Sequence, residues 1–110
     1  MILPLFDEVC TKAYMKVKYP RFSLDEVLDI LHYFFEAYER HRGEPHPPLT
    51  VGNTIRVIEK LSDDSYIFID NYTEYIDAYF DTRYRDCDYR INHFLSGRIT
   101  EILNCRLMCM

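Results

Sequence analysis

The chain has 110 residues, of which 48% are hydrophobic and 15% aromatic, so it holds enough apolar material for one compact domain and too much for a disordered chain. Its formal net charge of −5 argues against nucleic acid as the favoured partner. The sequence has no run of roughly 20 apolar residues and no signal peptide, so we expect a cytoplasmic protein whose cysteines remain free thiols.

The first part of the chain predicts two helices. Apolar residues from Phe6 to Val17 recur at helical spacing, and this first helix must end before Pro20. In the second helix, Ser23 and Glu26 predict a capping box, and Gly43 stands where a left-handed C-terminal cap is expected. The apolar stripe between them predicts a helix that faces a core and consists of Leu24, Val27, Leu28, Leu31, Phe34, Phe35 and Tyr38.

The middle of the chain predicts a connector and a third helix. Three prolines in GEPHPPL fix the backbone and remove hydrogen-bond donors, which makes this stretch rigid. The third helix covers TVGNTIRVIEKL, with Thr50 as its cap. The short run SYIFID has strand-like residues without an evident partner strand, so we interpret it as a linker or a helix start.

Three further helices are predicted after this run. Asn71 or Thr73 opens a fourth helix, and the stretch CDYRINHFLSG forms a joint around a short fifth helix that ends at Gly97. We expect three side chains of this joint to be buried, those of Tyr89, Ile91 and Phe94. The tail RITEILNCRLM forms the sixth helix. The whole pattern predicts a single all-α domain over residues 1–110, built as a compact bundle of about six helices.

Negative charge is concentrated between Ser62 and Arg90. This segment has eight carboxylates against three cations, and it also carries six of the ten tyrosines. One interpretation is a solvated face whose tyrosines help to build the core. The other is an acidic, tyrosine-bearing surface that binds a basic groove in place of phosphates. Under the second interpretation the binding residues are Asp63, Asp64, Asp70, Glu74, Asp77, Asp81, Tyr72 and Tyr75.

Cysteine and histidine residues in the second half of the chain suggest a zinc site. Cys105 and Cys109 are four residues apart on a predicted helix, so their sulfurs face the same side. Cys87 and His93 would complete a tetrahedral set, and His46 could replace His93. The spacing matches no standard zinc module, so free thiols are the alternative, and a histidine in a proline-rich loop is more often a hydrogen-bonding partner.

A polar stripe on the second helix offers a second chemical possibility. Its members could bind a metal or move protons, but they also occupy the face that the apolar stripe leaves over; they are Asp25, Asp29, His32 and Glu36. We favour the solvated face, because the Glu-x-x-His pairs of di-iron bundles are missing. The sequence also lacks a phosphate-binding glycine loop, a nucleophile elbow and an H-E-x-x-H motif, so we expect no enzyme.

Three stretches together resemble a known group of proteins. They are YFFEAYERHRGEPHPPL, the following VIEKL helix and DAYFDTRYRDCDYRINHFLSG, with PHPPL and CDYRINHF-x-SG as the most specific pieces. They resemble short accessory proteins encoded on plasmids, conjugative elements and prophages of clostridia and streptococci. The resemblance implies an accessory protein, and some members of the group are encoded near replication genes. By analogy, small, acidic, non-catalytic proteins of mobile elements in these hosts often look like inhibitors of host defence, including anti-CRISPR proteins. The tail NCRLMCM departs from the pattern, so a site using Cys105 and Cys109 would be a local addition.

These observations leave two hypotheses about function. The favoured one is a non-enzymatic protein that binds the basic surface of a host nucleic-acid-handling protein, with a CRISPR effector as the specific partner that the resemblance suggests. The alternative is a replication or maintenance accessory of a plasmid or phage. It would bind DNA or a replication protein through the basic strip KAYMKVKYPR, residues 12–21. Neither hypothesis involves a membrane.

Overall fold

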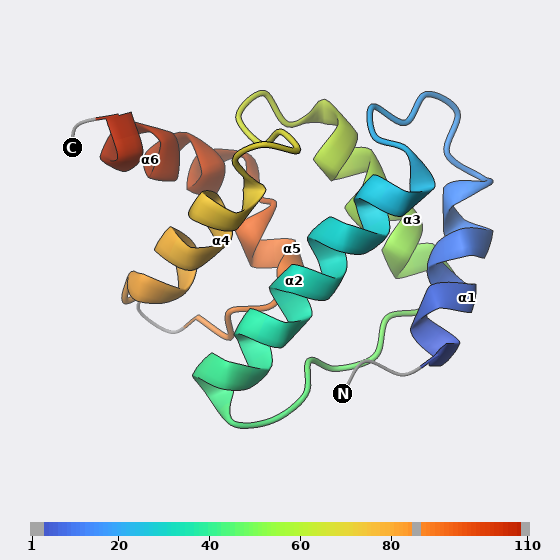
Figure 1. The fold of residues 1–110 in the computed structure, drawn as a ribbon, viewed down its shortest axis with the longest axis horizontal. Coiled ribbons are helices and arrows are strands. Elements are labelled where there is room, and N and C mark those ends of the chain that lie inside the picture. Colours follow the sequence, from blue (N-terminus) through green and yellow to red (C-terminus); the bar gives the residue numbers. More distant parts are fainter. Residues whose placement is uncertain (1–3, 85–86, 109–110) are drawn as a thin grey trace.

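The computed structural model describes residues 4–84 and 87–108, and this part of the chain forms six helices and no strand (Figure 1). The predicted all-α architecture is therefore confirmed. The radius of gyration is 13.4 Å, close to the value of about 13 Å expected for a compact globule of this length. In chain order the helices are α1 (Pro4–Tyr14), α2 (Leu24–Arg42), α3 (Val51–Asp63), α4 (Tyr72–Asp81), α5 (Ile91–Phe94) and α6 (Gly97–Met108).

The longest helix, α2, runs through the middle of the molecule. It packs against α1 and α4, while α1 also packs on α3 and α4 on α6. Figure 1 shows α1 and α3 on one side of α2, with α4 and α6 on the other. Within the described ranges, no helix has the length and apolar character needed to cross a bilayer.

Local signals explain where α2 begins and ends. The Ser23 Oγ accepts a hydrogen bond from the Glu26 N–H at 3.2 Å, and Glu26 Oε1 accepts one from the Ser23 N–H at 2.9 Å. Gly43 has φ +79° and donates its N–H to the carbonyl of Glu39. Because a left-handed backbone is readily adopted by glycine alone, this position ends the helix. The predicted capping box and C-terminal cap are both confirmed.

The third helix also starts as predicted, with Thr50 as its N-cap. Thr50 and Asn53 form a reciprocal pair, in which each side chain accepts a hydrogen bond from the other residue's N–H. Asn71 precedes α4 without capping it through its side chain. That side chain accepts a hydrogen bond from the Phe68 N–H and donates one to the Tyr66 carbonyl, so it shapes the preceding loop. SYIFID is therefore a linker.

The joint between α4 and α6 is partly as predicted. Tyr89, Ile91 and Phe94 are buried, which confirms their expected role in the core. The prediction that Gly97 ends the short helix is wrong, because α5 ends at Phe94 and Gly97 is the first residue of α6. The carbonyl of Ser96 accepts the N–H of Ile99, so the next helix already begins at this point.

Three aromatic rings join the helices at the centre of the core. Phe34 of α2, Tyr79 of α4 and Phe94 of α5 are each fully buried. Their ring centroids lie 5.1 to 6.0 Å apart, within the range in which aromatic rings attract one another. This contact fixes α4 and α5 relative to α2, and so positions the polar groups that these helices carry.

Candidate functional site

An open groove of about 620 Å³ lies along the polar face of α2, between α1 and α4. Four of its lining residues are carboxylates, and the walls also include a leucine, a histidine and two tyrosines. The lining residues are Asp7, Asp25, Leu28, Asp29, His32, Tyr33, Glu36 and Tyr72. The polar stripe predicted on the second helix therefore lines a groove, and α1 adds a carboxylate that the sequence pattern did not reveal.

The α1 wall of the groove is held by a contact between Asp7 and His32. His32 Nε2 lies 2.7 Å from Asp7 Oδ1, and both side chains remain partly exposed. The ring of Phe6 packs edge-on against His32 with 5.8 Å between centroids, which orients the imidazole. Asp7 and His32 therefore form a polar contact that connects α1 and α2 at the edge of the groove.

The α4 wall is held by a hydrogen bond between Tyr33 and Asp77. The Tyr33 hydroxyl donates to Asp77 Oδ1 at 2.8 Å, and the ring of Tyr33 packs edge-on against Tyr72 at 5.9 Å. The hydrogen bond to Asp77 is the main cause that raises the pKa of Tyr33 above its usual value, because the protonated hydroxyl is the donor of this bond. This bond joins the groove to the exposed face of α4.

Three predicted carboxylates share that face of α4. Glu74, Asp77 and Asp81 are all exposed, and their spacing of three and four residues places them on one side of the helix. We use the name acidic face for the four groove carboxylates, these three carboxylates of α4 and the two tyrosines between them. It consists of Asp7, Asp25, Asp29, Glu36, Glu74, Asp77, Asp81, Tyr33 and Tyr72.

The remaining predicted binding residues have different roles. Asp63 and Asp70 are exposed, at the end of α3 and in the following loop. Asp64 Oδ1 accepts the N–H groups of Tyr66 and Ile67 at 2.8 and 2.9 Å, so this carboxylate shapes its own loop. These two hydrogen bonds within the loop account for the position of the Asp64 carboxylate, and no binding partner is needed to explain it.

The two predicted tyrosines of α4 also differ. Tyr72 is partly buried and lines the groove. Tyr75 is 5% exposed, and its hydroxyl donates to Asn104 Oδ1 at 2.7 Å. Tyr75 therefore attaches α4 to α6, and its ring does not offer the exposed contact area expected from the sequence.

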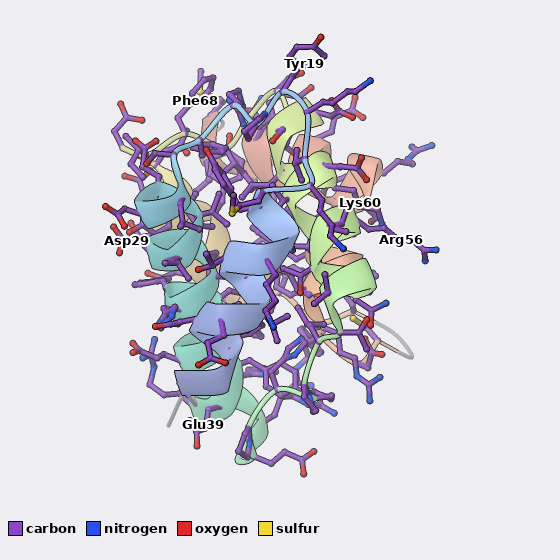
Figure 2. All side chains as sticks on the ribbon, turned by 90° about the vertical axis from the view of Figure 1, so that its right-hand side faces the viewer. Tyr19, Asp29, Glu39, Arg56, Lys60 and Phe68 are labelled. Carbon is purple, nitrogen blue, oxygen red and sulfur yellow. The ribbon has the colours of Figure 1, made fainter. Side chains whose placement is uncertain are left out.

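The basic strip lies on the α1 side of the molecule. Lys12, Lys16 and Lys18 are exposed there, and Arg21 is exposed as well, but its guanidinium is bonded to the protein's own backbone. Its Nη2 donates to the carbonyls of Leu61 and Ile67 at 3.1 and 2.7 Å. Figure 2 shows Asp29 and Glu39 on the α2 side of this view, opposite Arg56 and Lys60 on α3.

The expected zinc ligands come together only in part. Cys87 Sγ lies 3.2 Å from His93 Nδ1, whereas Cys105 is exposed on α6. Cys109 lies outside the described residues. Across residues 4–84 and 87–108, no group of three or more histidine, cysteine, aspartate or glutamate side chains could hold a metal ion. Of the expected ligands that the structure describes, it brings together one pair, Cys87 and His93.

No protein-family model matches this chain, and no curated protein or solved structure matches it either. The resemblance to accessory proteins of mobile elements therefore remains a hypothesis based on PHPPL and CDYRINHF-x-SG. The acidic face is the feature of the structure on which a function can be built.

Proposed function

We propose that this chain is a non-enzymatic protein that inhibits a nucleic-acid-handling defence protein of its host by covering a basic surface. The acidic face is the observation that supports this proposal. Its carboxylates come from three helices, and the bonds of Asp7 to His32 and of Tyr33 to Asp77 hold these helices in register. The helices that carry the negative charges therefore have fixed relative positions.

The shape and chemistry of the groove suit basic side chains of a partner. An open groove admits a protruding lysine or arginine, and carboxylates on its walls can form bidentate bonds with a guanidinium. Tyr33 and Tyr72 add aromatic surface on which a guanidinium can stack. Electrostatic attraction of this kind speeds association and suppresses neutral or acidic partners.

A CRISPR effector is the partner we propose to test first. The resemblance to accessory proteins of mobile elements suggests a target in host defence. Such effectors hold nucleic acid in positively charged channels, which an acidic protein can occupy by competition. Inhibition by occupancy needs no chemistry from this chain, in keeping with a non-enzymatic role.

The alternative function is a replication or maintenance accessory that binds DNA or a replication protein. It is supported by the exposed Lys12, Lys16 and Lys18, which lie close together in the chain. Arg21 weakens it, because its guanidinium donates to two backbone carbonyls and packs over the rings of Phe22 and Phe68. Three lysines alone give a small phosphate-binding surface.

Charge reversal at matched positions tests the proposal. The test pair is Asp29→Lys with Asp77→Lys on the acidic face, and the control pair is Glu59→Lys with Glu101→Lys at other exposed positions. Both pairs change the net charge equally. We expect the test pair to weaken binding to a purified guide-loaded effector about tenfold or more, and the control pair to change it by less than about threefold.

The same experiment separates the two functions. Equal losses from both pairs would show that net charge alone matters, and an unchanged affinity for the test pair would refute the acidic face as the interface. Direct DNA binding that weakens steeply with salt and is lost in Lys16→Glu would support the accessory function instead.

A further inference from the structure

Three side chains with reactive or titratable groups meet next to the joint between α4 and α5. Cys87 Sγ lies 3.2 Å from His93 Nδ1 and 3.6 Å from the Tyr79 hydroxyl, and this hydroxyl is itself 2.8 Å from His93 Nδ1. The backbone N–H of Tyr89 donates to the same sulfur at 3.2 Å. The sulfur therefore has three potential hydrogen-bond donors around it.

Each of these donors is held in place by the core. Tyr79 is fully buried, and its ring packs against His93 with 5.7 Å between centroids. Tyr89 has φ +59°, an unusual backbone for a residue other than glycine. Its hydroxyl donates to the Thr82 carbonyl and accepts the Tyr84 N–H, so its own side chain holds that backbone. The Tyr89 N–H is thus fixed beside the sulfur.

We propose that Cys87 is a reactive thiol, activated by His93, that small-molecule disulfides modify by thiol–disulfide exchange. This inference does not depend on the proposed binding function. A histidine next to a cysteine favours the thiolate, which is the nucleophilic form, and hydrogen bonds to a negative sulfur stabilise it further. Cys87 is partly exposed, whereas Cys10 is fully buried.

The exchange conserves atoms and electrons. The Cys87 proton moves to His93 Nδ1. The Nδ1–H, the Tyr79 O–H and the Tyr89 N–H can then each donate a hydrogen bond to the thiolate. This thiolate attacks one sulfur of the disulfide, and a new S–S bond to Cys87 forms as the disulfide's own S–S bond breaks. The leaving thiolate takes the proton from His93, and the disulfide itself is the oxidant.

The other described cysteines provide internal controls. Cys105 is exposed on α6, and no hydrogen bond to its sulfur occurs among the described residues. Cys10 is fully buried, and its burial, followed by the nearby Asp7, raises the pKa of its thiol to about 11. If exposure alone decided reactivity, Cys105 would react before Cys87. The proposal predicts the opposite order for these two residues, with Cys10 the slowest.

Mass spectrometry of the folded protein tests this order. The full chain is treated with iodoacetamide at about pH 7, and separately with oxidised glutathione, and labelling of each cysteine is followed over time. An ordinary thiol is only a few per cent ionised at this pH, so we expect Cys87 to react about tenfold faster than Cys105. His93→Gln and Tyr79→Phe should each reduce the rate at Cys87 and leave Cys105 unchanged.

Two outcomes would overturn the proposal. One is a Cys87 rate equal to or below that of Cys105 in the unmodified chain, a comparison that needs no variant to fold. The other is stoichiometric zinc in protein purified without an affinity tag that is lost in Cys87→Ser, because the thiolate would then be a metal ligand.

Discussion

The imidazole of His46 accepts a hydrogen bond from the backbone N–H of Ile91, with 3.1 Å between Nε2 and N. Its other nitrogen, Nδ1, lies 2.8 Å from the Pro47 carbonyl oxygen, so Nδ1 carries the proton and Nε2 is the acceptor. The bond ties the proline-rich connector to the start of α5. The ring lies against three aromatic residues of α2, Phe34, Phe35 and Tyr38.

Acid should weaken the fold through His46. Burial is the main cause that lowers the pKa of His46 below the usual 6.5, because the charged ring would lose its hydration. Protonation of Nε2 would also remove the acceptor for the Ile91 N–H. The unfolded chain takes up a proton near pH 6.5 and the folded chain only at lower pH. This contribution to stability is therefore present above about pH 6.5 and is lost as the pH falls below it.

Denaturant unfolding at about pH 7.5 and about pH 5.5 measures this effect. We expect His46→Gln to reduce the loss of stability between the two values, and the control His41→Gln, at an exposed position of α2, to keep it. An identical pH dependence in His46→Gln and the parent chain would show that His46 does not titrate with folding.

The sequence predicted best those features that depend on neighbouring residues. The predicted ends of α2 were correct, at the capping box of Ser23 and Glu26 and at Gly43. Such caps form their hydrogen bonds within one turn of the helix, so a local stretch of sequence is enough to predict them. Gly97 was misassigned because a glycine between two helices can follow one or open the next. Local sequence does not separate these cases when the first helix has only four residues.

The candidate site depends on contacts between distant residues, and these were predicted less well. The polar stripe on α2 was visible in the sequence, but the contact of His32 with Asp7 spans 25 residues and depends on how α1 packs. Tyr75 belonged to the same predicted helix as Tyr72, yet its hydroxyl donates to Asn104 on α6 and its ring is buried. Helical spacing shows which residues share a face, and tertiary packing decides which face is covered.

Arg21 should stabilise the contact of the loop between α1 and α2 with the end of α3 and the loop that follows it. Its Nη2 donates to the Leu61 and Ile67 carbonyls, and its guanidinium lies 4.4 Å from the Phe22 ring centroid and 4.8 Å from that of Phe68. Arg21→Lys keeps the charge but removes the planar guanidinium, which makes these hydrogen bonds and ring contacts. We therefore expect the unfolding free energy to fall by about 1–2 kcal/mol. Lys18→Ala, at an exposed position nearby, should change it by less than about 0.5 kcal/mol. Equal stability of Arg21→Lys and the parent would leave this arginine available for phosphates.

Phe94→Ala should be among the most damaging single changes. Phe94 is fully buried and contacts the rings of Phe34 and Tyr79 at 5.3 and 5.1 Å, so truncation opens a cavity where α2, α4 and α5 meet. Such a change normally costs roughly 3–5 kcal/mol. The control is Ile102→Ala, because Ile102 is 45% exposed on α6. A cost for Phe94→Ala as small as that of the control would contradict the central role of this ring.

Alkaline pH should destabilise the protein through Cys10. This thiol is fully buried, and its pKa is raised from 9.0 to about 11, mainly by burial and further by Asp7. Between these values the unfolded chain releases the proton and the folded chain retains it. The contribution is therefore complete below about pH 9 and is lost as the pH rises towards 11, by about 1 kcal/mol at pH 10.

We expect Cys10→Ala to be less stable than the parent at pH 8, because it leaves a small cavity. The difference in unfolding free energy between the variant and the parent should shrink by about 1 kcal/mol at pH 10. Cys105→Ala, at an exposed thiol, should leave the alkaline loss unchanged. A difference between Cys10→Ala and the parent that stays constant from pH 8 to pH 10 would mean that the folded chain ionises this thiol as readily as the unfolded chain does.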